Sequence, residues 1–124
     1  MDSIPLIDMN IVNETKRIVG PSFPNIVQAF IKVSPEYINE MREGFTEQSL
    51  HKIASGAHTL KSSCIQLGAA LLSETARKIE LKAKQEHITF KELVSELSPM
   101  FSELEELCVT TEKELASLIA SELI

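Results

Sequence analysis

The sequence predicts an all-α protein, an antiparallel up-down helical bundle with a four-helix core and a short N-terminal helix. Apolar residues recur at steps of three and four along most of the chain, and no stretch shows sustained alternation of period two. Four Gly and five Pro in 124 residues provide few turn signals, which favours long helices. Short connections between helical stretches favour antiparallel neighbours. A chain of this length, 44% hydrophobic and 24% charged, fits a single domain over residues 1–124.

The first two helices are delimited by capping residues and by proline. We expect a helix over Met9–Val19, with Asp8 as its N-cap and the pair Gly20-Pro21 as its end. A second helix should cover Phe23–Phe45, and Pro35 should bend or split it just before that position, because proline removes a backbone hydrogen bond. Its inward stripe is predicted to consist of Ile26, Val27, Phe30, Val33, Tyr37, Ile38 and Met41.

The third and fourth helices meet at a glycine. Thr46 is a suitable N-cap for the third helix, which should extend to about Leu67, and Gly68 offers a left-handed stop. The fourth helix should cover about 69–85. One face of it should be buried, consisting of Leu72, Ala76, Ile79 and Ala83.

The last helix opens at a capping box. Thr89 and Glu92 have the spacing of that motif, and Pro99 should break or kink the helix that follows. Its apolar positions are Leu93, Leu97, Leu104, Leu107, Leu115, Leu118 and Ile119. Because this helix is rich in leucine, a homodimerising bundle is an alternative to the monomer that we expect.

Composition and charge exclude several classes of function. The 18 acidic against 12 basic residues give a net charge of -6, which disfavours a nucleic-acid partner. The longest apolar runs, such as Leu67–Leu72, are far shorter than the ~20 residues of a membrane-spanning helix. The acidic N-terminus is unlike a signal peptide. Cys64 and Cys108 form no CxxC pair, so we expect buried, reduced thiols and a cytoplasmic protein.

Neither a metal site nor a cofactor site is expected. His51 and His58 are seven residues apart, whereas two ligands on one helix face are usually four apart, and His87 lies elsewhere. The sequence contains no glycine-rich phosphate loop, no nucleotide fingerprint and no nucleophile elbow.

The third helix carries the candidate site. At about 100° per residue its apolar residues form one core stripe, and His58 lies on the opposite side of the helix. Lys61 follows at i+3, Ser62 at i+4 and Ile65 two turns on, all on the side of His58. The core stripe consists of Ile53, Ala57, Leu60, Cys64 and Leu67.

Taken alone, a histidine in this position is most simply a solvated surface imidazole. A cation, a hydroxyl and an apolar side chain around it are instead typical of a transient docking site for a charged group. We expect Lys61 to be exposed and to act more through its position than through its contribution to stability.

The residues from Ala57 to Ala69 read AHTLKSSCIQLGA, which resembles the signature of the histidine-containing phosphotransfer (HPt) domains of bacterial phosphorelays. The Phe30…Pro35-Glu36 stretch and the charged run Arg77-Lys78-Ile79-Glu80 resemble further parts of that family. Two positions depart from it: Ser62 stands where many members have glycine, and Cys64 stands where serine or alanine is usual.

The resemblance implies a phosphocarrier without independent kinase activity. His58 would accept a phosphoryl group from the aspartyl phosphate of a receiver domain and pass it to the aspartate of another. Lys61 would offset phosphoryl charge, and Ser62 would hydrogen-bond a phosphoryl oxygen or the imidazole. Ile65 and Ala69 would form an apolar docking patch, with Gly68 keeping its rim low. The receiver would supply Mg²⁺.

The partners implied are response-regulator receiver domains and a hybrid sensor kinase. A kinase dimerisation helix would also carry a phosphorylated histidine, but Thr59-Leu60-Lys61-Ser62-Ser63 does not match its motif and no ATP-binding segment follows. A non-catalytic helical adaptor, or degenerate HPt domain, that binds receivers or kinases without carrying phosphate remains the alternative.

Overall fold

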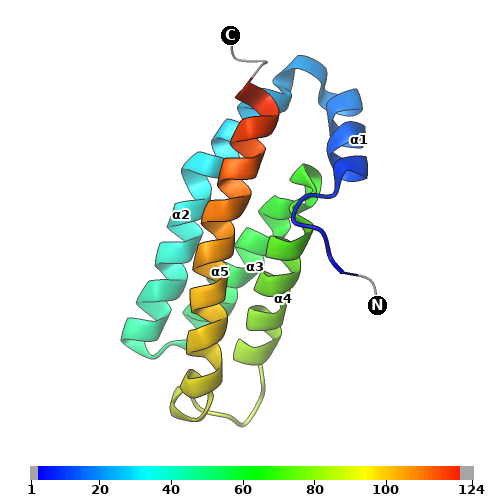
Figure 1. The fold of residues 1–124 in the computed structure, drawn as a ribbon. Coiled ribbons are helices and arrows are strands. Elements are labelled where there is room, and N and C mark those ends of the chain that lie inside the picture. The colour runs from blue at the N-terminus through cyan, green and yellow to red at the C-terminus, as the bar shows by residue number, and fades with distance from the viewer. Residues whose placement is uncertain (1–2, 121–124) are drawn as a thin grey trace.

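The fold is an up-down bundle, seen here in a computed structural model that describes residues 3–120. Within that range four long helices lie side by side: α2 (Phe23–Glu47), α3 (Leu50–Cys64), α4 (Ala70–Ala83) and α5 (Phe90–Ile119). They alternate in direction, and each packs against two of the others, so that α2, α3, α4 and α5 form a closed ring (Figure 1). The predicted all-α up-down bundle is confirmed.

Three short elements complete the described chain. Helix α1 (Met9–Val19) lies beside one end of the bundle (Figure 1) and joins α2 through a 3₁₀ turn, η1 (Gly20–Ser22). A second 3₁₀ turn, η2 (Ile65–Leu67), ends α3 and contacts α1. No helix among the described residues is long and apolar enough to cross a membrane.

The core follows the predicted apolar stripes. Every predicted core residue of α3–η2 and of α4 is buried, and the stripes of α2 and α5 are buried or half-buried. The N-terminal helix takes part as well, because Val12 is fully buried in the same cluster.

Side-chain caps set the start of several helices. The Asp8 carboxylate accepts hydrogen bonds from the backbone N–H groups of Asn10 and Ile11, and α1 has the predicted bounds. The Thr89 hydroxyl accepts a hydrogen bond from the Glu92 N–H at 3.3 Å and donates one to the Glu92 carboxylate at 3.0 Å. Thr89 is therefore the N-cap of α5, as predicted.

The predicted start of the third helix is wrong. The α2 helix continues through Thr46, whose hydroxyl donates to the carbonyl of Arg42 one turn earlier and is therefore unavailable as a cap. The chain turns at Gln48 in the left-handed region, and the hydroxyl of Ser49 then accepts from the Lys52 N–H at the start of α3.

Neither proline splits its helix. Pro35 lies inside a continuous α2, and Pro99 lies inside a continuous α5. Both rings are exposed, and the helices are held on both sides of each proline by buried neighbours such as Phe30, Ile38 and Phe101. Packing of the long apolar faces therefore outweighs the loss of one backbone hydrogen bond in each helix.

An N-terminal segment, residues 4–8, crosses the junction between η2 and α4. The Asp8 N–H donates to the carbonyl of Gly68 at 2.7 Å, and the Leu71 N–H donates to the carbonyl of Pro5 at 3.1 Å. Because Ala69, the N-cap residue of α4, offers no side-chain acceptor, the Pro5 carbonyl satisfies one of the free N–H groups of that helix. We call residues 4–8 the N-terminal strap.

Gly68 is required for two reasons. Its φ of +66° lies in the left-handed region, and a Cβ atom there would lie 2.6 Å from the carbonyl oxygen of Asp8 in the strap. Asparagine tolerates the left-handed region but also carries a Cβ atom.

We therefore expect both Gly68→Ala and Gly68→Asn to lower the free energy of unfolding, by roughly 1–3 kcal/mol, in urea denaturation. At an ordinary left-handed helix end, asparagine would recover most of the loss. Equal stability of Gly68→Asn and the wild type would contradict the close approach of the strap.

Candidate functional site

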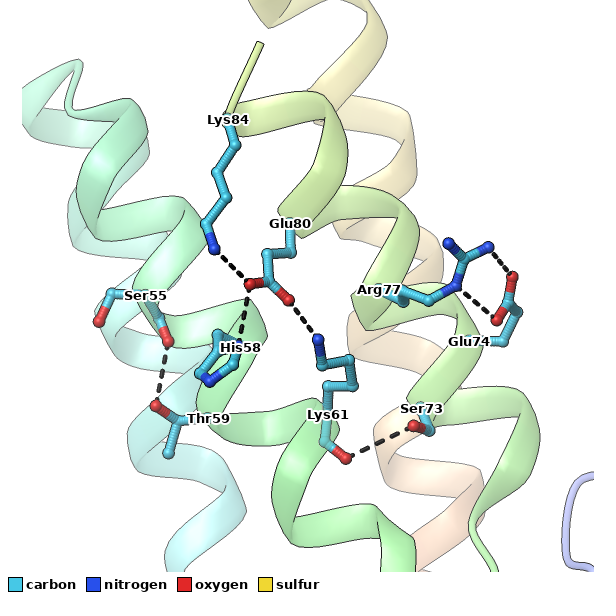
Figure 2. Close-up of polar contacts among 9 residues, drawn as sticks. All are labelled: Ser55, His58, Thr59, Lys61, Ser73, Glu74, Arg77, Glu80 and Lys84. Atoms are coloured by element: carbon cyan, nitrogen blue, oxygen red, sulfur yellow. Dashed lines mark hydrogen bonds and ion pairs between the residues drawn. The ribbon is translucent and has the colours of Figure 1, made fainter.

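His58 projects from the middle of α3 on the side that faces α4. Its side chain is 56% exposed, whereas the neighbouring residues Ala57 and Leu60 are fully buried in the bundle. The histidine is therefore fixed at its backbone by the core and accessible at its ring. The Nδ1 atom of the ring lies 2.9 Å from Oε2 of Glu80, which reaches across from α4 (Figure 2).

Glu80 is the centre of a polar cluster between the two helices. Its carboxylate is only 5% exposed, because Glu80 lies on α4 next to the buried positions Ala76 and Ile79. Lys61 of α3 donates to Oε1 at 2.7 Å, and Lys84 at the end of α4 donates to Oε2 at 2.7 Å (Figure 2). We refer to His58, Lys61, Glu80 and Lys84 as the Glu80 cluster.

The surrounding cations keep Glu80 ionised. Burial by itself raises the pKa of this carboxyl group, but the hydrogen bonds from Lys61, Lys84 and His58 outweigh burial and lower the pKa from 4.5 to about 2. Glu80 is consequently a carboxylate at any physiological pH.

An ionised Glu80 determines which nitrogen of His58 carries the proton. A carboxylate only accepts hydrogen bonds, so the Nδ1 atom at 2.9 Å has to be the donor. In the neutral ring the lone pair then resides on Nε2, which points away from Glu80 (Figure 2). The site thus presents a ring nitrogen that carries a lone pair, on a side chain that is 56% exposed.

Lys61 is less exposed than the sequence suggested. Its side chain is 26% exposed and its ammonium is paired with the buried carboxylate, so it is a member of an ion-pair cluster as well as a surface cation. Lys84 is 57% exposed and lies at the C-cap of α4. Both ammonium groups bind the same carboxylate as the imidazole and therefore stay near the ring.

One further hydrogen bond joins α4 to α3 beside the cluster, and another lies within α3. The Ser73 hydroxyl of α4 donates to the carbonyl of Lys61 at 3.4 Å, and the Thr59 hydroxyl donates to the carbonyl of Ser55 within α3. Arg77 pairs with Glu74 on its own helix and points away from Glu80 (Figure 2).

Comparison with known proteins bears on what this site does. The sequence model of the Hpt domain family matches residues 25–121. The chain belongs to the Hpt domain family. Membership supports a histidine phosphotransfer role in phosphorelays, with receiver domains of response regulators as partners.

A solved structure supports the Hpt fold. The crystal structure of histidine-containing phosphotransfer protein B from Pseudomonas aeruginosa PAO1 matches with a TM-score of 0.81 at 15% sequence identity, over 93% of this chain and 95% of that chain. No curated protein sequence matches the chain significantly. At that identity, the structural match is a match of the fold.

The remaining predicted residues of this Hpt domain are Ser62, expected at the phosphoryl group, and the docking residues Ile65, Gly68 and Ala69, and their surroundings differ. Ser62 is exposed on the His58 side of α3, and Ile65 is 63% exposed. Ala69 is fully buried and Gly68 is buried too, because the N-terminal strap covers the junction that contains them. The predicted apolar patch of Ile65 and Ala69 has to be corrected, since Ala69 offers no surface to a partner.

The cysteines of the Hpt domain lie in the core. Burial raises the pKa of both thiols, Cys64 and Cys108, to about 12, so neither is a nucleophile near neutral pH. Among residues 3–120, no group of three or more His, Cys, Asp and Glu side chains is arranged to hold a metal ion.

Glu80 and Lys84 are the two members of the Glu80 cluster to which the sequence analysis assigned no role, and Glu80 is the central one. It belongs to a charged run on α4, a pattern that usually marks a solvated face. The position of Glu80 on a helical wheel does indicate that its side chain is buried. Glu80 is four residues after the buried Ala76 and three before the buried Ala83, at the edge of the core stripe.

The shifted pKa of Glu80 predicts a pH dependence of stability. Since the folded-state pKa of about 2 lies below the ordinary value of 4.5, Glu80 stabilises the fold above pH 4.5, and this contribution is lost as the pH falls toward 2. At pH 7 we expect Glu80→Gln to lower the free energy of unfolding by roughly 2–3 kcal/mol, and this difference from the wild type should shrink as the pH falls from about 5 to 2.

Urea titrations at a series of pH values measure this difference. Glu14→Gln provides a matched control, because it removes a surface carboxylate that is 56% exposed and paired with Arg17. A difference between Glu80→Gln and the wild type that stays constant from pH 7 to pH 2 would rule out the ion-pair role of Glu80.

Proposed function

We propose that this Hpt domain accepts a phosphoryl group on Nε2 of His58 from the aspartyl phosphate of one receiver domain and passes it to the aspartate of a second. The observation that carries the proposal is the contact of Nδ1 with the ionised Glu80, which leaves the lone pair on Nε2 of a side chain that is 56% exposed. This contact supports a role for His58 as a nucleophile that needs no dedicated general base.

The transfer proceeds by exchange of one bond. Nε2 attacks the phosphorus atom, the N–P bond forms, and the P–O bond to the receiver aspartate breaks with the aspartate leaving as a carboxylate. The imidazole ring, protonated on Nδ1 and phosphorylated on Nε2, carries a positive charge that the Glu80 carboxylate balances at 2.9 Å. Transfer to the next receiver is the reverse reaction.

Two side chains of α3 would assist at the phosphoryl group. Lys61 holds an ammonium group beside the ring, where it offsets the charge of the phosphoryl oxygens. Ser62 is exposed one turn after His58 and donates a hydrogen bond to a phosphoryl oxygen. The Mg²⁺ ion that phosphoryl transfer requires belongs to the receiver.

The cellular setting is proposed on the same basis. A phosphocarrier between receivers works in the cytoplasm, as a monomer that meets a hybrid sensor kinase and a response regulator in turn. Ile65 contributes to docking, since it is apolar, 63% exposed and lies at the start of η2, seven residues after His58.

The site assignment predicts the fate of a radioactive label. When a ³²P-phosphorylated receiver is mixed with this protein, we expect acid-labile, base-stable label on the wild type and none on His58→Gln. His51→Gln, which replaces an exposed histidine of the same helix, should be labelled like the wild type. Label on a folded His58→Gln protein would disprove the assignment, and binding of receivers by an unlabelled wild type would establish the adaptor.

The role of Glu80 predicts a tautomer. In ¹⁵N NMR, the neutral form of His58 should be protonated on Nδ1, and Glu80→Ala should lose this preference and transfer phosphate on the order of 10–100-fold more slowly. Glu74→Ala removes a carboxylate of α4 that pairs with Arg77 and should change neither value. Wild-type transfer rates in Glu80→Ala, or an unchanged tautomer, would refute the positioning role.

A further inference from the structure

Lys84 is the member of the Glu80 cluster to which the proposed transfer gives no role. Its side chain is 57% exposed, and its ammonium group donates to Oε2 of Glu80 at 2.7 Å (Figure 2). Oε2 is also the oxygen that Nδ1 of His58 contacts at 2.9 Å, whereas Lys61 donates to the other oxygen, Oε1, at 2.7 Å. The two ammonium groups are equally close to the carboxylate, but only that of Lys84 shares its oxygen with the imidazole.

The position of Lys84 in the chain ties it to Glu80. The two residues lie four positions apart at the end of α4 with the carboxylate first, which is the favourable order for an ion pair on a helix. Lys84 is also the C-cap residue of α4, where the negative end of the helix dipole favours a cation. The ion pair of Lys84 with Glu80 therefore depends on a single helix.

Lys61, by contrast, belongs to the helix of the histidine. It follows His58 by three residues on α3, and its ammonium group crosses to α4 to reach Glu80. A phosphoryl group on the ring is a second anion beside Lys61 and competes with Glu80 for that ammonium group. A carboxylate that is 5% exposed then needs another cation, because an unpaired buried charge is costly. Among residues 3–120, the other ammonium group in contact with Glu80 is that of Lys84.

We propose that Lys84 is a positioning residue, whose ammonium group holds Oε2 of Glu80 against Nδ1 of His58, and that Lys61 is the cation that serves the phosphoryl group. The inference rests on the proposed function, because a histidine that accepts phosphate on Nε2 needs its proton kept on Nδ1. Lys84 acts through Glu80 and does not contact the reacting atoms. The two lysines thus have separate tasks, although both donate to one carboxylate.

The tautomer of His58 separates the two tasks without any phosphotransfer. The sample is the full, unphosphorylated chain, and ¹⁵N NMR of the neutral histidine ring is the measurement. Lys84→Met should lose most of the preference for protonation on Nδ1, because Oε2 loses the donor that positions it, whereas Lys61→Met should keep this preference. Lys84→Arg should restore the wild-type tautomer, since a guanidinium group also binds a carboxylate.

Urea denaturation should rank the two methionine variants in the opposite order. Lys61 is 26% exposed and Lys84 is 57% exposed, so Lys61→Met removes the more buried cation and should lower the urea midpoint more. A lysine with a structural role alone would change the midpoint and leave the tautomer unchanged. Lys82→Met is the matched control, because it removes a lysine of α4 that pairs with Glu96 on α5 and should alter neither tautomer nor transfer.

A double-mutant cycle shows through which group Lys84 acts. With a ³²P-phosphorylated receiver at saturating concentration, Lys84→Met should accept phosphate about tenfold more slowly than the wild type. In a Glu80→Gln background the same substitution should slow transfer no further, whereas Lys61→Met should still slow it. A second slowing by Lys84→Met in that background would mean a direct contact with the phosphoryl group and would overturn the positioning role.

The tautomer comparison can overturn the proposal as well. A wild-type tautomer in Lys84→Met, or a loss in Lys61→Met as complete as in Lys84→Met, would show that the two lysines do not divide their tasks in this way. A wild type that is never labelled on His58 would instead refute the proposed phosphotransfer, and the tautomers of the two variants would still decide the positioning role.

Discussion

The Glu80 carboxylate lies almost buried between α3 and α4, and such a charge is stable only when donors from both helices neutralise it. Lys61 and His58 come from one helix and Lys84 from the other. The cluster therefore fixes how the two helices pair and, through the same bonds, how the imidazole is oriented. Stability and reactivity share one set of contacts here, so a substitution chosen to alter the chemistry also changes the fold's resistance to denaturation.

The cluster is buried at its centre and exposed at its rim. Glu80 is 5% exposed, whereas the side chains of His58 and Lys84 are more than half exposed and therefore open to a partner. An ammonium group that is already beside the carboxylate needs little movement to contact an incoming anion on the ring. Preorganisation of this kind lowers the cost of placing charge at the moment of transfer.

Most of the fold and part of the site follow from local sequence patterns. The apolar stripes of α3 and α4, the caps Asp8 and Thr89, and the left-handed Gly68 each depend on neighbours within a few residues. Other features depend on contacts distant in sequence. Pro35 is tolerated because tertiary packing holds α2 together, and the partner of His58 is 22 residues away on another helix. The burial of Ala69 could not be predicted from its neighbours in sequence, because the strap that covers it comes from more than 60 positions earlier in the chain.

The strap also has a consequence for the modular exchange of such domains between signalling proteins. The family match begins at residue 25, yet Val12 is fully buried in the common core and Pro5 completes the first turn of α4. A domain transplanted from residue 25 onward would lack Val12, which is part of its core. It would also lack the Pro5 carbonyl, which accepts a hydrogen bond from the first turn of α4. The unit that evolution or an engineer can move intact therefore starts at the strap, some twenty residues before the recognisable family sequence.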